Sequence, residues 1–280
     1  MPTFDTPEPI VATIDAGAGH VWIYASDRTD TVVEVRPTDE SADADVHAAK
    51  QAQVEYANGR LLVKAPKSKI RSIVGRTPSV DVTVELPTGS RVDADAWSEI
   101  RSEGRLGDST FKNAAGAIRL DQTGRLKLRT AAGDISVARA SEHADVSTAS
   151  GKVWLGEIDG TAAVKSSNGD ITVGEVTGDL RLNTANGDIT VERALASVAA
   201  KTAYGNMRVG EVVRDSVDLE TSFGEVEIGI AEGTAAWLDV NSKLGSVRSD
   251  LEAAGEPGPS EETVKVRART GFGDIVIRRS

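Results

Sequence analysis

The chain of 280 residues contains no cysteine, so disulfide bonds and thiolate metal sites are excluded. Aromatic residues are also scarce: they make up 4% of the chain, whereas hydrophobic residues as a whole make up 39%. A core must therefore be built from Val, Ile, Leu and Ala, which favours thin, regular layers. The 27 glycines and 9 prolines indicate many short strands and turns.

A secretory signal and a membrane-spanning run are missing as well. The first residues, MPTFDTPEPIVATIDAG, include neither a basic nor a long apolar stretch, and no run approaches the roughly 20 apolar residues that span a bilayer. We expect a cytoplasmic protein without direct membrane insertion, or an extracellular one if a leader or anchor has been removed. The net charge of −11 makes the chain acidic and argues against binding of nucleic acid.

An internal repeat of about 18 residues is the most informative feature of the sequence. The phrases SNGDITV, ANGDITV and FGDIVI mark it, and the glycine of each phrase serves as an anchor. The anchors are Gly116, Gly133, Gly151, Gly169, Gly187, Gly205, Gly224, Gly245 and Gly273, with Ser98 in the equivalent place one unit earlier. The spacing lengthens after Gly205, through 19, 21 and 28 residues, so the repeat loosens towards the C-terminus.

Each unit carries apolar residues at fixed places around its anchor. They lie two and four positions after it and five and seven positions before it, and Thr or Ser lies three before it. This alternation predicts two short strands per unit with one buried face each. One unit cannot bury that face alone, but stacking on a neighbour at ~4.8 Å completes its hydrogen bonds and extends a narrow core.

The repeat therefore predicts an all-β chain: a parallel β-helix, or β-solenoid, of about ten coils of about 18 residues. The alternative is a meander of antiparallel hairpins, because Asn-Gly turns also suit hairpins. We favour the solenoid, since a single-layer meander would need a partner layer that no helical segment supplies. We expect residues 89–280 to form the solenoid domain and residues 1–88 to form a small β-rich N-terminal cap.

Several local features are predicted outside the repeat. IVATIDAG, HVWIYAS and DTVVEVRP alternate like strands, ESADADVHAAKQ indicates a short helix, and Asn58-Gly59 indicates a hairpin turn. We also interpret Gly17–Gly19 as a hairpin turn. Arg278 and Arg279 are expected at the terminal edge, where charge would hinder end-to-end stacking. Two loops are expected, one with the basic residues Lys67, Lys69, Arg71 and Arg76, and one over DLEAAGEPGPSEET. The basic loop is interpreted as a solvated crossing, with an acidic partner as the alternative.

No catalytic, metal or cofactor site is predicted. The three histidines lie far apart, no nucleophile or phosphate-binding motif occurs, and the tryptophans fall at different phases of the repeat. The sharpest polar candidates are Asp170 and Asp188, which follow their anchors and would stack one coil apart. They could share a Ca²⁺ ion, but calcium takes six to eight oxygens. We favour turn carboxylates that accept backbone N–H groups.

The stretch VTVELPTGSRVDADAWSEI, followed by TANGDITV-like units, resembles the DUF4097 family of bacterial β-strand-repeat proteins, often labelled candidate adhesins. The resemblance covers about residues 80 to 280. It implies a β-helical, toast-rack-like fold without known catalytic residues. It also implies a link to envelope-stress or membrane-linked systems, where related domains occur.

These observations predict a non-enzymatic scaffold with protein partners, in a bacterial stress-response or envelope-linked complex. The first alternative is a surface adhesin-like or glycan-binding protein. Less favoured alternatives are a carbohydrate-active β-helix enzyme and a filament protein that self-associates through the solenoid ends.

Overall fold

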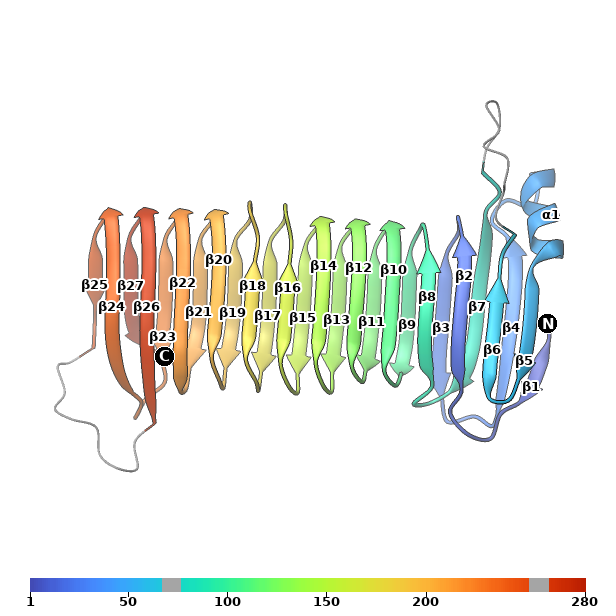
Figure 1. Cartoon of the computed structure of the whole chain (residues 1–280), viewed down its shortest axis with the longest axis horizontal. Coiled ribbons are helices and arrows are strands. Elements are labelled where there is room, and N and C mark those ends of the chain that lie inside the picture. The colour runs from blue at the N-terminus through green and yellow to red at the C-terminus, as the bar shows by residue number, and fades with distance from the viewer. Residues whose placement is uncertain (67–76, 252–261) are drawn as a thin grey trace. The chain divides into compact units, whose positions relative to one another are not determined.

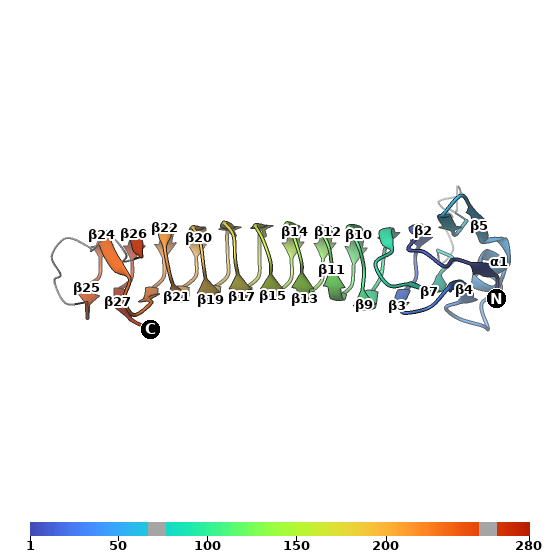
Figure 2. The ribbon, with the colours of Figure 1, turned by 90° about the horizontal axis from the view of Figure 1, so that it is seen from below.

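The computed structural model describes residues 1–66, 77–251 and 262–280. Both loops expected from the sequence, the basic one and the one over DLEAAGEPGPSEET, fall largely outside these residues. The chain forms two compact units, Met1–Ala138 and Arg139–Ser280, which are described separately. In each unit the strands form two facing layers (Figures 1 and 2). No helix in the described ranges is long and apolar enough to cross a bilayer.

Unit 1 contains one helix and the first strands of both sheets. Its elements are β1 (Thr3–Asp5), β2 (Val11–Gly17), β3 (Val21–Ser26), β4 (Asp30–Pro37), α1 (Asp43–Gln51), β5 (Gln53–Ala57), β6 (Arg60–Lys64), β7 (Val80–Pro87), β8 (Arg91–Ala96), β9 (Ile100–Arg105), β10 (Ser109–Ala115), β11 (Ile118–Thr123) and β12 (Leu126–Ala132). One sheet has the order β1-β4-β7-β3-β9-β11 and the other β5-β6-β2-β8-β10-β12. The boundary between the units falls within β13 (Ile135–Ala140).

Unit 2 consists of strands alone in its described part. They are β14 (Ala144–Ser150), β15 (Val153–Ile158), β16 (Ala162–Lys165), β17 (Ile171–Val176), β18 (Leu180–Asn183), β19 (Ile189–Ala194), β20 (Val198–Tyr204), β21 (Met207–Val212), β22 (Asp215–Phe223), β23 (Val226–Ile230), β24 (Ala235–Leu244), β25 (Val247–Ser249), β26 (Thr263–Phe272) and β27 (Ile275–Arg279). One sheet has the order β15-β17-β19-β21-β23-β27-β25 and the other β14-β16-β18-β20-β22-β26-β24.

The predicted solenoid is confirmed by parallel pairing of each strand with its equivalent in the next coil. Ile171 lies beside Ile189 and Val173 beside Val191, one repeat apart in the sequence. All four of these side chains are at most 1% exposed. Like residues therefore stack on like residues in a narrow aliphatic core, which explains why so few aromatics suffice. The hairpin meander is ruled out, because its strands would pair antiparallel.

The anchor glycines form a column at one corner of the coil. Gly205 has a φ of +151°, and a Cβ built there would lie 2.1 Å from the carbonyl oxygen of Gly187, one coil earlier. The backbones of successive coils approach too closely for any side chain. Glycine is therefore required at this corner by contact between coils as well as by its backbone angles.

The predicted helix and the predicted hairpin at Asn58-Gly59 are confirmed. Helix α1 covers Asp43–Gln51, and β5 pairs antiparallel with β6 across the turn. Asn58 and Gly59 have φ values of +51° and +71°, as a type I′ hairpin turn requires. The prediction for Gly17–Gly19 is wrong: β2 and β3 lie in different sheets, so these glycines turn a corner of one coil. A Cβ on Gly19 would meet the Val80 carbonyl oxygen.

Coils near the N-terminus do not stack in sequence order. β2 pairs in parallel with β6 and β8, and β3 with β7 and β9, so the coil β2–β3 lies between β6–β7 and β8–β9. The region 1–88 thus contributes two coils as well as the non-repeating β1, β4, α1 and β5. The domain boundary at residue 88 stays a prediction.

The last coils of unit 2 show the same exchange of order. β26 pairs with β22 on one side and β24 on the other, and β27 lies between β23 and β25. The coil β24–β25 is therefore outermost, although it precedes β26–β27 in the sequence. The expectation for Arg278 and Arg279 is wrong, because both lie on β27 and not on the terminal edge. Anchor spacing gives the length of each coil, and it does not give the order in which the coils stack.

Candidate functional site

The aspartates that follow the anchors bind backbone N–H groups of the next coil. Oδ1 of Asp170 accepts the N–H of Asp188 at 3.2 Å, and Oδ1 of Asp188 accepts the N–H of Asn206 at 2.7 Å. Asn206 continues the row by accepting the N–H of Glu225 at 2.9 Å. At this corner the strand ladder is interrupted, so side-chain oxygens replace the missing carbonyl acceptors.

Calcium binding at Asp170 and Asp188 was the only metal hypothesis from the sequence, and it is untested. Besides the contacts above, Oδ2 of Asp170 lies 3.4 Å from Nζ of Lys152. Among the described residues, no three His, Asp or Glu side chains gather closely enough to hold a metal ion. The geometry of both aspartates is that of the turn carboxylates favoured above.

The Thr column links coils through the same corner. Thr202 donates its hydroxyl to the carbonyl oxygen of Gly187 at 3.3 Å, and Thr221 donates to that of Gly205 at 3.1 Å. Both threonines are nearly buried, at 7% and 3% exposure. These bonds satisfy glycine carbonyls that the strand ladders leave at the corner. Polar residues of the repeat therefore serve the stacking of coils.

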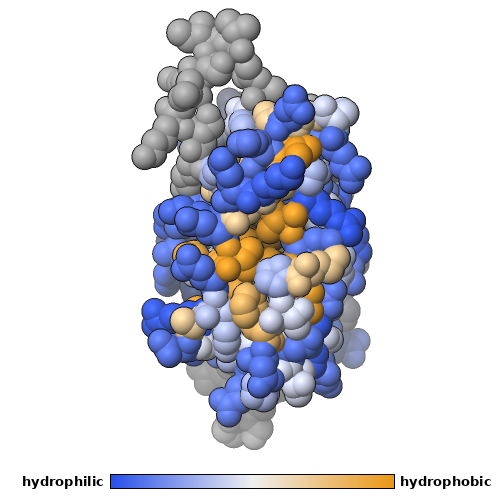
Figure 3. Space-filling view, turned by 90° about the vertical axis from the view of Figure 1, so that its right-hand side faces the viewer, coloured by the Kyte–Doolittle hydropathy of each residue, from blue (hydrophilic) through white to orange (hydrophobic). Residues whose placement is uncertain are grey.

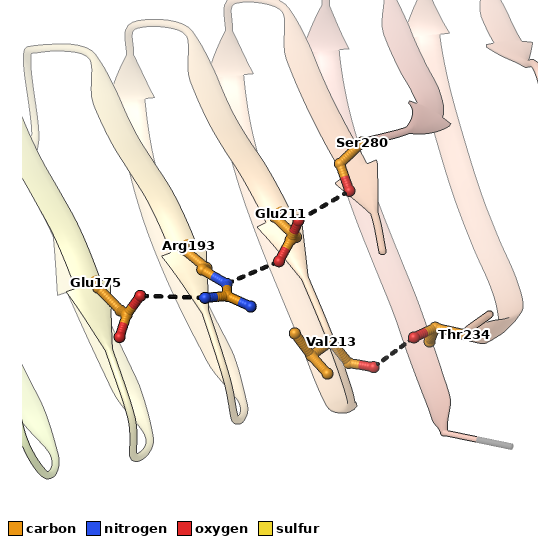
Figure 4. A network of polar contacts seen from close by, with 6 residues as sticks. All are labelled: Glu175, Arg193, Glu211, Val213, Thr234 and Ser280. Atoms are coloured by element: carbon orange, nitrogen blue, oxygen red, sulfur yellow. Dashed lines mark hydrogen bonds and ion pairs between the residues drawn. The ribbon is translucent and has the colours of Figure 1, made fainter. Parts of the chain in front are cut away.

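The outer surface of unit 2 carries rows of ion pairs. Arg193 lies between Glu175 and Glu211 on neighbouring coils, with nitrogen–oxygen distances of 3.4 Å and 2.8 Å, and Ser280 contacts Glu211 (Figure 4). The hydrogen bond that Arg193 donates to the Glu211 carboxylate is the main reason that the pKa of Arg193 is raised. All three charged side chains are well exposed, so such pairs contribute little stability. They provide no reactive group.

An exposed aromatic ladder in unit 2 is the most distinctive surface feature. Tyr204, Phe223 and Phe272 end the neighbouring strands β20, β22 and β26. The ring centroids of Tyr204 and Phe223 are 5.0 Å apart and those of Phe223 and Phe272 are 4.7 Å apart, with interplanar angles of 3° and 4°. The three side chains are 57%, 43% and 48% exposed, respectively. Leu244 of β24, paired with Phe272, extends the ladder and is 61% exposed.

The sequence carries a signal for this ladder in the position before each anchor glycine, although the positions of the tryptophans do not reveal it. Its members all stand immediately before an anchor glycine, whereas earlier coils have Ser150, Asn168 and Asn186 at this place. The side-chain amide of Asn186 donates to that of Asn168 at 2.9 Å. The same column thus changes from a polar ladder to an apolar one at Tyr204.

Stacking covers both faces of the central ring and one face each of Tyr204 and Phe272, so the ladder presents mainly ring edges. Each face of Phe223 is stacked on a neighbouring ring, and Phe272 lies between Phe223 and the Leu244 position. Sugars stack on open aromatic faces, so this arrangement is unsuited to a pyranose platform. An exposed apolar ridge of this kind instead marks an interaction site.

Unit 1 contains a small cavity of about 280 Å³. Its walls include Asp15, Ala48, Pro66 and Thr77, and Trp97 lies at it with 53% of its side chain exposed. Pro66 and Thr77 border residues that the structure does not describe. Asp95 adds a second carboxylate to the wall, and most of the remaining wall residues are alanine, glycine or proline, which supply no acid, base or nucleophile.

Several solved structures of bacterial proteins resemble the chain. They include a candidate adhesin from Parabacteroides merdae ATCC 43184, with 12% identity, 100% of this chain and 95% of that chain covered, and a TM-score of 0.43. A candidate adhesin from Parabacteroides distasonis ATCC 8503 has 14% identity, coverage of 98% and 95%, and a TM-score of 0.42. A candidate lipid-binding protein from the same P. distasonis strain has 11% identity, coverage of 100% and 95%, and a TM-score of 0.29.

No curated protein sequence matches the chain. The family model described as Toastrack DUF4097 matches residues 23–217 and again residues 175–278. These matches cover most of the chain, including the coils of both units. The chain therefore belongs to the DUF4097, or Toastrack, family.

Proposed function

We propose that the protein is a non-enzymatic interaction scaffold that binds a protein partner through the aromatic ladder of unit 2. The observation that carries the proposal is the row of Tyr204, Phe223 and Phe272, each 43% or more exposed on adjacent strands. Exposing three large rings to water is unfavourable, because burying such a side chain is worth about 1.5–3 kcal/mol. Binding of a partner over the ladder would recover this free energy. Aromatic side chains are enriched at protein interfaces, where the partner buries them.

The rigidity of the ladder also supports binding. Each ring is fixed by its neighbours, and the strands beneath are held in register by parallel pairing of Tyr204 with Phe223 and of Phe223 with Phe272. A ridge that is already ordered loses little conformational entropy on association. The partner that fits is a protein with an apolar groove that accepts ring edges.

A surface adhesin-like or glycan-binding role is the alternative proposal, and a carbohydrate-active enzyme is a third. The stacked rings disfavour a sugar platform, because sugars stack on open aromatic faces. Absence of a cofactor, absence of enzymatic activity and the cytoplasmic location remain predictions. Fractionation of native cells would test the location, and recovery from the cell surface would favour the adhesin-like role.

The ladder is tested by placing a photoreactive phenylalanine analogue at residue 223 in the full chain. We expect a specific cross-linked protein in cells, and we expect its capture to fall at least severalfold when Tyr204 and Phe272 are both changed to Ser. The matched control places the analogue at Trp154, another exposed aromatic residue of unit 2, at 45% exposure. Equal cross-linking at 223 and 154, or capture unaffected by the double variant, would refute the proposal.

A further inference from the structure

The outermost strand of unit 2 has an open edge. In the described part of the chain, β24 has a neighbour on one side only, which is β26. Ala235 donates its N–H towards that neighbour, to Glu262 at 2.8 Å. Because successive residues of a strand face opposite neighbours, the backbone groups of Leu238, Val240 and Ser242 point to the open side. This edge is ten residues long and can accept another strand.

Apolar side chains are exposed along the same coil. Trp237, Leu238 and Leu244 are 64%, 38% and 61% exposed on β24, and Val247 is 43% exposed on β25. A shallow groove of about 380 Å³ is lined by Trp237, Leu238 and Asp239 of β24 and by residues 265–267 of β26. A long, apolar edge of this kind pairs with other strands unless something protects it. In the part of the chain that the structure describes, this edge is unprotected and can take a further strand.

We infer that the occupant is a second copy of this chain, paired edge to edge through β24 about a two-fold axis at Asn241. A two-fold axis normal to the sheet makes the two strands antiparallel and pairs residues whose numbers are equally far from 241. Asp239 then lies opposite Lys243 of the other copy, twice. Leu238 lies opposite Leu244, and Val240 opposite Ser242.

Charge selects this register among those that keep the buried face inward. Asp239 and Lys243 both stand on the outward face, and opposite charges directly across an antiparallel pair attract. Asp239 already accepts both bonds from Arg269 at 2.7 Å and 2.8 Å, and a carboxylate has lone pairs left for a lysine. Trp237 lies opposite Gly245 in this register, so its ring meets no side chain.

The second sheet fits the same axis. Ser249 lies four residues after the corner at Gly245, as Asn241 lies four before it. An axis through both positions brings Arg248 opposite Asp250 of the other copy, which is a second pair of complementary charges. Isologous pairing of this kind is closed, so it yields a dimer and not a fibre.

Head-to-tail growth is disfavoured by the edges of unit 1. Its outer strands β5 and β1 have five and three residues, too few to cover the ten of β24. Short edges of this kind protect a sheet against further pairing. The inference concerns β24 and β25 and does not depend on the partner proposed for the aromatic ladder.

The test uses the absence of cysteine in the chain. Residue 241 would face its own copy in a non-hydrogen-bonded pair, where Cα atoms lie about 4.5 Å apart, within the range for a disulfide. We expect Asn241→Cys to form a disulfide dimer on mild oxidation. The control, Arg181→Cys, is exposed on the same sheet but on the inner strand β18, and should form no disulfide-linked dimer. Equal cross-linking of both variants would overturn the inference.

Sedimentation of the full chain over a concentration series gives the second readout. We expect a twofold rise in mass, at least about tenfold weaker dimerisation in Lys243→Asp, and recovery in Asp239→Lys/Lys243→Asp. The matched control Lys165→Asp changes an exposed lysine on β16 and should behave as wild type. A constant monomer mass, growth beyond the dimer, or no effect of Lys243→Asp would each contradict the inference.

Discussion

The outermost coils at the two ends of the chain differ in how their buried face is covered. At the N-terminal end, β6 has β5 paired along its outer side, and Leu61 is 1% exposed. At the C-terminal end, β24 has no outer neighbour among the described residues, and Leu238 is 38% exposed. Strand pairing, and not the repeat itself, therefore decides whether a terminal coil is closed.

The covering at the N-terminal end is itself incomplete. Phe4 of β1 packs on Tyr56 of β5 with ring centroids 5.3 Å apart, and both are half-buried. A view onto this end shows apolar surface at its centre with hydrophilic residues around it (Figure 3). Short antiparallel strands protect the edge there, whereas the C-terminal end presents a long parallel edge. A strand edge can therefore be protected by pairing while apolar surface beside it remains exposed.

The largest difference is expected between Leu61→Ala and Leu238→Ala. Removing the buried Leu61 side chain should lower the free energy of unfolding by about 2–5 kcal/mol, as for other core leucines. Removing the Leu238 side chain should cost less, about 1–2 kcal/mol, since 38% of its surface is already exposed to water. Denaturant unfolding of both variants measures this, at dilutions where the chain is monomeric. Equal losses of unfolding free energy in the two variants would contradict the proposed difference between the two terminal coils.

A smaller effect is expected from the aromatic contacts at each end. Phe223→Leu removes two stacked contacts and should cost about 1–2 kcal/mol, whereas Phe4→Leu removes one and should cost about 0.5–1.5 kcal/mol. Leucine keeps most of the apolar surface, so the difference reports ring stacking. Thermal unfolding of the two variants is the measurement. A larger loss for Phe4→Leu would show that the ladder contributes no stacking energy.

Alanine substitutions at two glycines with positive φ, one near each end of the chain, should lower the stability by similar amounts but loosen different strands. Gly59 in the β5–β6 turn has a φ of +71° and Gly233 before β24 has a φ of +78°, and a Cβ at either has nothing within 4 Å. Alanine should therefore cost about 1 kcal/mol at each, for backbone strain alone. Amide exchange should rise along β5–β6 in Gly59→Ala and along β24 in Gly233→Ala. If amide exchange rises at both ends of the chain in either variant, the expectation that each glycine affects only its neighbouring strands is wrong.

The smallest effect on stability is expected from replacing one carboxylate near each end of the chain, Asp274 or Asp30. The pKa of Asp274 lies below its ordinary value of 3.8, chiefly because the carboxylate accepts the N–H of Ser246 in the outermost coil. The pKa of Asp30 is lowered chiefly by a hydrogen bond from Arg28, which also contacts Glu85. Folding lowers both values, so each carboxylate stabilises the fold above pH 3.8, and the contribution is lost as pH falls through the lowered pKa.

Melting curves from about pH 6 to about pH 3 test this linkage. Asp274→Asn and Asp30→Asn should each reduce the acid-induced fall in melting temperature, because the titrating group is gone. A fall equal to that of the wild type in both variants would exclude these carboxylates as the source.

The regular coils could be predicted from the sequence because each contact is local in the repeat. Ile171 and Ile189 stand at equal distances from their anchors, so pairing follows from spacing alone. The order of the terminal coils could not be predicted in this way. β26 lies between β22 and β24, and no spacing distinguishes this arrangement from sequential stacking.

The candidate site was predicted only in part. The aspartate column was found because GD recurs in the sequence, and Asp170 and Asp188 accept backbone N–H groups as the turn interpretation predicts. The aromatic ladder was missed because its members differ in type and lie in the loosened part of the repeat. Stacking of Phe223 on Phe272 joins residues that are separated by a complete coil, β24–β25, in the sequence.

The central claim is that β24 is an open edge in the monomer and becomes covered by its own copy. Residue-resolved amide exchange over a dilution series tests it most directly. We predict that Val240 exchanges fast in dilute solution and slowly at high concentration, while Val63 of β6 is protected throughout. Strong protection of Val240 at the lowest concentration, or none at the highest, would contradict the account.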